Sequence, residues 1–406
     1  MRDVVVTGVG MTRFDKFLDR GVRSLAEEAV RSALEDAGVE PAGVQIAFFS
    51  NAVGGLITGQ EMIPGQAALR HTGLLGVPLF NVENACASAS SAFHLAWMTV
   101  ASGMYDVALA VGAEKLTHPD KTVSFRAIGT AVDLEQLHEL TAGTEGDKGG
   151  GAPQDGGQEK RSFFMDVYAT MAREYMRRSG ATVEDFAEIS VKNHLHGTLN
   201  PYAQYREAVT RQDVLASREI AGPLTLLMCS PIGDGAAAAV LCSRQAAHRL
   251  EVTNPVQVRA SVVVSGRDRE PGEETAVERA AERAYEAAGI APSDLDVVEV
   301  HDAAAPAELM VYEELGLCGK GEGPSLLASG ATRLGGRQPV NPSGGLLSKG
   351  HPIGATGIGQ IVEVVWQLRG QAGDRQVDGA RVGLTENGGG FLGTDPAAMS
   401  VHLFSG

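Results

Sequence analysis

Apolar runs typical of buried strands alternate along the chain with stretches of helical spacing. Residues 4–6 form a short apolar run, residues 25–37 carry apolar positions three and four apart, and residues 44–49 form a second run. Gly38 follows the predicted helix directly, in the position where glycine often ends a helix. Strands that alternate with helices in this way predict an α/β fold.

The same helix-to-strand unit recurs in the second half of the chain at a constant offset of 251 positions. The recurring positions share a cap glycine, a following proline and an apolar strand start: Gly38, Pro41 and Ile46 match Gly289, Pro292 and Val297. Such an ordered match indicates an internal duplication. A loop, a helix and a strand follow in both copies, over residues 81–87, 88–101 and 107–111 and over residues 341–354, 355–368 and 382–385.

Two similar βαβαβ halves would bring their loop-to-helix turns together across a pseudo-twofold axis, so we expect one active site between the halves. The glycine-rich residues 387–390 follow the last predicted strand and are expected to form a turn there. We divide the chain into an N-terminal half, residues 1–250, and a C-terminal half, residues 251–406.

An insertion at about residues 115–218 does not fit the repeat. It contains two helical patterns, at residues 164–178 and 183–193, and a stretch at residues 141–161 whose Gly, Gln, Asp and Lys content predicts a surface loop. We interpret the insertion as a lid or a substrate-binding excursion, and a purely structural insertion is the alternative.

Composition and charge narrow the class of protein. The net charge of −16 disfavours nucleic acid and anionic membranes as partners, but it leaves room for a local basic funnel around one phosphorylated ligand. The sequence lacks a secretory leader and an 18-residue apolar window, so we expect a cytoplasmic protein without a membrane span.

The use of cysteine and glycine is informative. The four cysteines lack the spacing of a disulfide framework or a metal site, and no metal is expected. Glycine makes up 51 of 406 residues, well above its usual share of about 7%. Because glycine costs backbone entropy, the excess needs a reason such as a positive φ or a close backbone approach.

Two motifs could form a nucleophile and its base. Cys86 stands in NACASASS at residues 84–91, where a strand-like segment meets a helix of small residues, and the positive end of a helix dipole favours a thiolate. His351 stands in GGLLSKGHPIGATG at residues 344–357, just before a helix, and could act as general base for a thiol. An inert buried cysteine and a structural histidine are the alternatives.

Two further motifs end predicted strands. His301 follows the buried run at residues 297–300, on the edge of the sheet where α/β proteins bind ligands, although a capping histidine would fit the same position. Asn387 begins NGGG, which could offer an amide and backbone N–H groups to an oxyanion. The duplication predicts that all four motifs converge.

Together these motifs resemble the thiolase superfamily, most closely its sterol-carrier-protein type. The segments KNHLH at residues 192–196, NPYA at 200–203 and CSPIGDGAAA at 229–238 also resemble that type, and the similarity runs nearly from end to end in order. The resemblance implies a thiolase fold with α-β-α-β-α layers.

The resemblance also implies roles for individual residues. Cys86 would take an acyl group from acyl-CoA after His351 removes its proton, and His301 would hold the thioester oxygen of the second substrate. The backbone at Cys86 and around Gly389 would form an oxyanion hole, and Asn387 would belong to the same catalytic set. The insertion and the loop near Ser348 would hold coenzyme A.

The family further implies a CoA thioester as substrate and no tightly bound cofactor. A homodimer formed through the N-terminal sheet is expected, and a small OB-fold, zinc-ribbon protein that binds acyl-CoA is a candidate partner.

The sequence departs from the family at one point. Thiolases of this type carry a second cysteine as acid/base, either two residues after the histidine of the HD motif or in the last glycine-rich segment, where this chain has Ala303 and Glu386-Asn387. Three hypotheses follow: an active C-acyltransferase in which His301, His351 or Glu386 moves the proton, a retro-aldolase of steroid side-chain breakdown, and a non-catalytic acyl-CoA or lipid-binding relative. The retro-aldolase relatives carry tyrosines at both histidine positions, unlike this chain.

Overall fold

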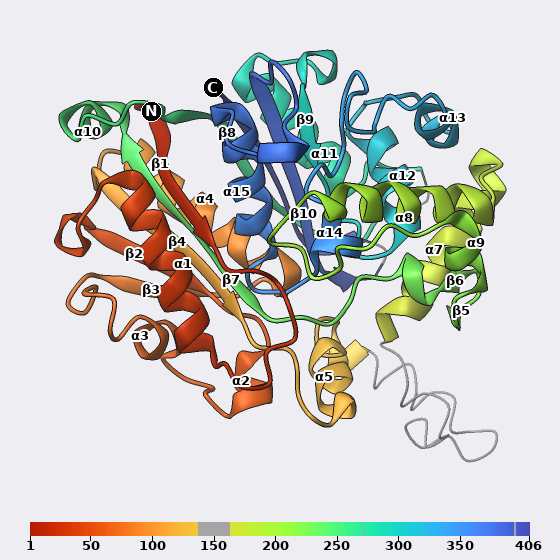
Figure 1. The fold of residues 1–406 in the computed structure, drawn as a ribbon, viewed down its shortest axis with the longest axis horizontal. Helices are drawn as coiled ribbons and strands as arrows, with labels where there is room; N and C mark the ends of the chain where they lie inside the picture. Colours follow the sequence, from red (N-terminus) through yellow and green to blue (C-terminus); the bar gives the residue numbers. More distant parts are fainter. Residues whose placement is uncertain (137–162, 271, 394) are drawn as a thin grey trace.

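The computed structural model describes residues 1–136, 163–270, 272–393 and 395–406 (Figure 1). Its main sheet has the strand order β3-β2-β4-β7-β1-β8-β11-β10-β9. The strands of this sheet are β1 (Val4–Met11), β2 (Ile46–Ser50), β3 (Leu79–Val82), β4 (Val107–Glu114), β7 (Gly235–Ser243), β8 (Val256–Ser265), β9 (Val297–Glu299), β10 (Val382–Leu392) and β11 (Asp395–Ser405). A separate small sheet pairs β5 (Glu219–Ala221) with β6 (Leu224–Thr225).

The main sheet repeats one strand order outward from its centre, where β1 pairs with β8. The first half runs β1-β7-β4-β2-β3, and the second runs β8-β11-β10-β9, with a parallel bridge from Val298 to Val340 beyond β9. The helices α1 (Val22–Ala37) and α11 (Ala276–Ala288) both end at a left-handed glycine, Gly38 at φ 62° and Gly289 at φ 63°. The duplication predicted from the sequence is confirmed.

The helices form three layers around the two halves of the sheet. The helices α1 and α3 (Pro64–Ala68) cover the outer face of the first half, and α11 packs against β8 and β11 of the second. Between the halves lie α4 (Ser88–Ala101) and α15 (Thr356–Arg369), which contact each other and strands of both halves. The predicted α-β-α-β-α layering of the thiolase fold is therefore present.

The insertion packs against the second half of the molecule. Its helices α7 (Phe163–Ser179) and α8 (Val183–Thr198) confirm the two predicted helices and contact α12 (Ala305–Glu314), as Figure 1 shows. The loop expected at residues 141–161 lies outside the described residues. The remaining helices are α2 (Gly54–Thr58), α5 (Lys121–Ile128), α9 (Arg211–Ala216), α10 (Arg244–Arg249), α13 (Gly323–Ala328) and α14 (Gly345–Lys349).

The prediction of a turn at residues 387–390 is wrong. These residues lie within β10, where Asn387 pairs with Ser400, Gly388 with Met399 and Gly389 with Ala398 of β11. Glycines are unfavourable inside a strand unless another backbone approaches closely. Here a Cβ on Gly389 would lie 2.2 Å from the carbonyl oxygen of Asn84, so contact with the loop before α4 explains the glycine.

Two other predictions concern the chain as a whole. None of the helices that the structure describes combines the length and the apolar character needed to cross a membrane. The proposed division after residue 250 falls between α10 and β8. That division and the cytoplasmic location stay predictions.

Gly112 of β4 tests how tightly the halves interlock. A Cβ at this position would lie 2.5 Å from the carbonyl oxygen of Gly354, which belongs to the other half. We expect Gly112→Ala to lower the free energy of unfolding by about 1–3 kcal/mol, the usual cost of overpacking. Thermal and denaturant unfolding would measure the change. In the control, Gly129→Ala, the new methyl group would find its nearest neighbour at 3.4 Å, and an equal loss in both variants would contradict the interlock.

Candidate active site

Cys86 lies in a tight turn at the start of α4. It is the middle residue of the 3-10 turn η2 (Ala85–Ala87), and the non-glycine residue Ala85 has a positive φ of 47°. The hydroxyl of Ser88 holds this turn, since it donates to the carbonyl of Ala85 and accepts from the amide of Asn84 at 2.9 Å. The turn exposes the sulfur to a cavity.

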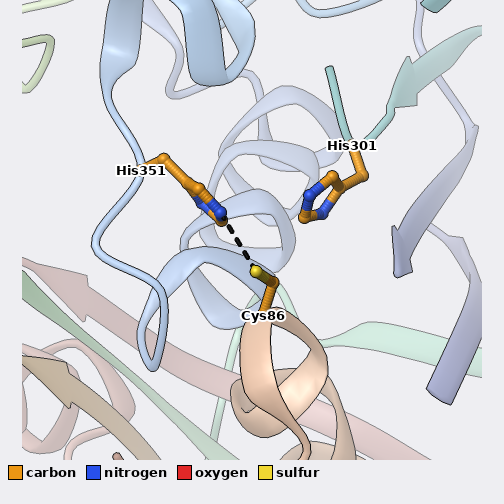
Figure 2. A group of neighbouring side chains, drawn as sticks. All are labelled: Cys86, His301 and His351. Atoms are coloured by element: carbon orange, nitrogen blue, oxygen red, sulfur yellow. Dashed lines mark hydrogen bonds between the residues drawn. The ribbon is translucent and has the colours of Figure 1, made fainter. Parts of the chain in front are cut away.

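His351 reaches the same sulfur from the C-terminal half. Its Nε2 lies 3.3 Å from Sγ of Cys86, as Figure 2 shows. Its Nδ1 lies 2.7 Å from the hydroxyl of Thr356, and that hydroxyl donates its proton to the carbonyl of Pro352. The Thr356 oxygen must therefore accept from Nδ1–H, which leaves Nε2 unprotonated and able to accept the thiol proton.

His301 carries the opposite tautomer. The side-chain nitrogen of Asn387 lies 2.8 Å from Nδ1 of His301, and the amide oxygen of Asn387 accepts from the hydroxyl of Ser90 at 2.8 Å. Because Nδ1 of His301 accepts, its proton resides on Nε2, where it can be donated. The two rings stand nearly perpendicular with centroids 5.0 Å apart, and both flank Cys86 in Figure 2. One imidazole is a base and the other is a hydrogen-bond donor.

Burial keeps all three groups neutral. Desolvation lowers the pKa of His301 to about 4, and desolvation together with the neighbouring His301 lowers the pKa of His351 well below its ordinary value. Desolvation also raises the pKa of the Cys86 thiol to about 12, although the backbone amide of Gly390 opposes the shift. The helix dipole favours a thiolate at Cys86, but desolvation by burial outweighs the dipole. The site therefore contains a Cys86 thiol beside a neutral His351.

Buried carboxylates fix the loop that carries His351. Glu299 accepts from the amide of Ser343 at 3.0 Å and from Nζ of Lys349 at 3.1 Å. Asp302 accepts from the amide of Leu346 at 2.6 Å. The two acids flank His301 within residues 299–302, so one short stretch of chain carries His301 and also positions the His351 loop.

Glu114 performs a similar task for the first half. Its carboxylate accepts the amides of Ala52 at 3.0 Å and of Gly354 at 3.0 Å, so it ties a loop of one half to the His351 loop of the other. Desolvation raises the pKa of Glu114 to about 7.

The cavity at Cys86 has a volume of about 1250 Å³. Beyond the catalytic groups it is lined by aromatic and methionine side chains, among them Phe164, Tyr168, Met171, Met310 and Phe391. The exposed cations Lys16, Lys121 and Arg218 line it at the protein surface. The buried part of this lining is therefore mostly apolar, and the exposed part carries charges of both signs, since Glu61 and Glu83 also line the cavity.

The structure places the six predicted site residues differently. It brings Cys86, His301 and His351 to the cavity, and it places Asn387 behind His301, so the Asn387 amide serves the histidine rather than the cavity. Gly389 also lines the cavity, whereas Ser348 does not: its side chain is fully buried and donates to the carbonyl of Tyr205 at 2.8 Å. We therefore do not assign a coenzyme A contact to Ser348.

Sequence reasoning missed Tyr168 and Glu314 of the cavity wall. Glu314 ends α12, on the helix face that also carries Ala307, Met310 and Val311 toward the cavity. Residues at positions i, i+3, i+4 and i+7 share one helix face, and a carboxylate at the end of such an apolar face was the available signal.

The same donors could in principle hold a metal. The ligand atoms of Cys86, His301 and His351 lie within 4.8 Å of one another. A thiolate and two imidazoles are ligands that suit Zn²⁺. Such an ion would be coordinated by the Cys86 sulfur, and this is the sulfur that His351 is placed to deprotonate.

Comparisons with known proteins cover nearly the whole chain. The family model described as thiolase, N-terminal domain, matches residues 4–245, and the one described as thiolase C-terminal domain-like matches residues 261–400. The chain is 43% identical to an acetyl-CoA acetyltransferase of Methanothermobacter thermautotrophicus, over all of both chains. It is 40% identical to the benzoylsuccinyl-CoA thiolase subunit BbsB of Thauera aromatica, over 96% of this chain and 95% of that one.

Human sterol carrier protein 2 is 37% identical over 95% of this chain and 70% of its own. Among solved structures, the Ltp2-ChsH2(DUF35) aldolase matches with a TM-score of 0.78 and 26% identity, over 99% of this chain and 97% of that one.

The protonation state of Cys86 can be tested with iodoacetamide. Because the thiol has a raised pKa and His351 is neutral, we expect the alkylation rate of Cys86 to keep rising from pH 7 to pH 10. Peptide mass spectrometry at each pH would give the rate, and Cys86→Ser would remove the signal. A plateau already reached near pH 7 would show a preformed thiolate–imidazolium pair instead.

Proposed function

The chain belongs to the thiolase family, and from this premise we propose that it is an acyl-CoA C-acyltransferase that works through an acyl-cysteine at Cys86. The observation that carries the proposal is the 3.3 Å contact between Sγ of Cys86 and the unprotonated Nε2 of His351. A nucleophile, an adjacent base and a third group that orients the base form the arrangement that covalent catalysis requires.

In the first half-reaction His351 takes the thiol proton as the Cys86 sulfur attacks the thioester carbonyl. The C–S bond to coenzyme A then breaks, the acyl group stays on Cys86, and His351 returns the proton to the leaving thiolate. Two backbone amides, those of Cys86 and Gly390, lie close enough to the sulfur to lower its pKa. The same donors are suited to the negative charge that develops during attack, whether on sulfur or on the carbonyl oxygen.

In the second half-reaction a carbon or sulfur nucleophile attacks the acyl-cysteine. His301 has its Nε2–H free of the bond that Asn387 makes to Nδ1, so it would donate to the thioester oxygen of the second substrate. A neutral donor in a dry site stabilises a developing enolate without having to give up its proton.

The cavity has suitable regions for both parts of an acyl-CoA. In a protein of net charge −16, three exposed cations line the cavity against two exposed carboxylates, Glu61 and Glu83. These cations, Lys16, Lys121 and Arg218, suit the phosphates of coenzyme A. The aromatic and methionine lining beyond Cys86 suits an apolar acyl group. The similarity to a benzoylsuccinyl-CoA thiolase subunit supports an acyl group larger than acetyl.

We propose a homodimer formed through β3. This strand is the edge of the main sheet, and no other strand that the structure describes pairs with its outer side. Phe80 of β3 is 54% exposed and stacks on Phe48 with ring centroids 5.6 Å apart. An exposed apolar edge strand is prone to pair with another chain.

We propose also that a small OB-fold, zinc-ribbon protein assists with acyl-CoA. The support is the structural similarity to the Ltp2-ChsH2(DUF35) aldolase, a complex with a DUF35 partner. That similarity makes retro-aldol cleavage of a CoA thioester the second candidate function. The Cys86–His351 contact favours acyl transfer, because retro-aldol cleavage does not need an acyl-cysteine.

Covalent labelling tests the proposed function. We expect acyl-CoA to add one acyl group to Cys86 and to release one equivalent of free CoA, and intact-protein mass spectrometry would record the adduct. Cys86→Ala should abolish it. Cys229→Ala is the matched control, because Cys229 lines the same cavity and has its pKa raised by burial.

Product analysis then separates the candidates. A thiolase consumes free CoA as it cleaves a 3-ketoacyl-CoA, whereas a retro-aldolase yields a ketone or an aldehyde and consumes no CoA. Cleavage without any adduct on Cys86 would contradict the acyltransferase, and acyl-CoA binding without adduct or cleavage would indicate a binding protein.

The dimer makes a separate prediction. We expect sedimentation to give twice the chain mass for the wild type and the chain mass for Phe80→Lys, since a charge on the edge strand opposes pairing. The control Met104→Lys changes a side chain that is 71% exposed and lies outside the strands of the sheet, and it should leave the dimer intact. A dimeric Phe80→Lys would locate the interface elsewhere.

A further inference from the structure

The reaction proposed above needs a base for carbon, and neither histidine is oriented for that task. Formation of a C–C bond requires removal of a proton from the α-carbon of the second thioester. Nε2 of His351 faces the Cys86 thiol, and Nε2 of His301 bears a proton because Asn387 donates to Nδ1. Ala303, which lines the cavity two residues after His301, has no titratable group.

Five carboxyl groups line the cavity among the described residues: Glu61, Glu83, Glu314, Glu386 and Asp395. Asp395 is paired with Arg279 at 3.1 Å, and Glu61 and Glu83 are exposed. Glu314 ends α12, where burial and then the charge of Glu386 raise its pKa. Among these five carboxyl groups, Glu386 alone accepts a hydrogen bond from a catalytic residue, the backbone amide of His301.

Glu386 is held in the cavity wall beside His301. Its Oε2 accepts from the backbone amide of His301 at 2.8 Å, and its main-chain carbonyl accepts from the side chain of Gln360 at 3.0 Å. Side chains alternate along β10, so Glu386 and Gly388 face the cavity while Asn387 lies behind it.

The surroundings of Glu386 favour a carboxyl that changes protonation near neutral pH. Desolvation raises its pKa to about 7, and the His301 amide limits the rise. The titratable groups around it come from five segments: Cys86 from the turn before α4, Tyr168 from α7, Glu314 from α12 and the two histidines from two different loops. None of these carries a positive charge at neutral pH that would hold the carboxylate ionised.

We propose that Glu386 is the acid/base catalyst of the C–C bond-forming step, which this chain performs without a second cysteine. This inference rests on the proposed acyltransferase function. The Glu386 carboxylate removes a proton from the α-carbon of the second acyl-CoA, and His301 donates to the enolate oxygen that results. The enolate carbon attacks the acyl-cysteine carbonyl and forms the new C–C bond. The bond from carbon to Cys86 sulfur breaks, its electron pair stays on sulfur, and the sulfur regains one proton as Glu386 releases the one it took.

Glu386 and His301 act on different atoms of the second substrate, the α-carbon and the thioester oxygen. The attacking α-carbon of the second substrate lies about 3–3.5 Å from the carbonyl carbon of the acyl-cysteine. The carboxyl that takes the α-proton lies on the far side of that α-carbon, so Glu386 does not need to contact the Cys86 sulfur. In the reverse direction the protonated carboxyl gives its proton to the departing α-carbon. A pKa near the working pH lets one group serve both directions.

Isotope exchange into acetyl-CoA tests the proposal. In D₂O we expect the wild type to replace methyl protons of acetyl-CoA by deuterium, which NMR and mass spectrometry detect. Glu386→Gln should slow this exchange about 100-fold or more, the usual contribution of acid–base catalysis, because the amide cannot take the proton. Acylation of Cys86 should stay within about threefold, since the glutamine oxygen can still accept the His301 amide.

The two half-reactions separate failure of this proposal from failure of the proposed function. Exchange that is unchanged in Glu386→Gln, with acylation intact, would overturn the role of Glu386 and leave the acyl-cysteine standing. A wild type that is neither acylated nor active in exchange would overturn the proposed function itself. Acylation without any exchange by the wild type would remove the carbon-deprotonation step and, with it, Glu386 as its catalyst.

A second variant covers a folding defect in Glu386→Gln. Glu386→Asp keeps the carboxyl on a shorter side chain, and we expect it to retain acylation and measurable exchange, slower than in the wild type and dependent on a group that titrates. Loss of exchange in both variants, with acylation intact, would indicate that the carboxyl must stand at the position to which the longer glutamate side chain brings it. Equal exchange in the aspartate variant and in Glu386→Ala would contradict the role.

Discussion

A thiol from one half of a duplicated fold must stay within hydrogen-bond distance of an imidazole from the other half, and much of the structure serves this contact. Cys86 begins α4, and His351 precedes α15, the equivalent helix of the second copy. The two helices pack against each other in the central layer. A shift of the halves by even 1 Å would lengthen the 3.3 Å contact beyond useful proton transfer.

The loop that carries His351 is held at the site by buried charge rather than by apolar packing alone. Glu299 and Lys349 form an ion pair that is almost completely buried, and Glu308 pairs with Lys192 nearby. Removing one partner of such a pair typically costs about 3–5 kcal/mol, whereas exchanging both for apolar groups can be neutral. The pairs are therefore better understood as fixing the conformation of the His351 loop than as a source of net stability.

The sequence was most informative where chemistry and local geometry coincide. The motifs around Cys86, His301 and His351 could be found because each combines a reactive side chain with a turn or a strand end, and the duplication indicated that they converge. The tautomers could not be found, because they depend on Thr356 and Asn387 contacts that only the folded chain creates. Residues 387–390 were assigned to a turn since strand propensity disfavours three glycines, and tertiary packing against Asn84 overrides that preference.

The placement of Asn387 within β10 has a consequence for the dynamics of the site. Its backbone pairs with Ser400 in the ladder to β11, and its side chain orients His301. A donor mounted on a loop can open by local fluctuation, but one mounted on a central strand opens only when the ladder does. The catalytic tautomer of His301 therefore persists as long as β10 stays paired with β11. Slow subglobal unfolding of these strands, and not loop motion, sets how often the hydrogen bond from Asn387 to His301 breaks.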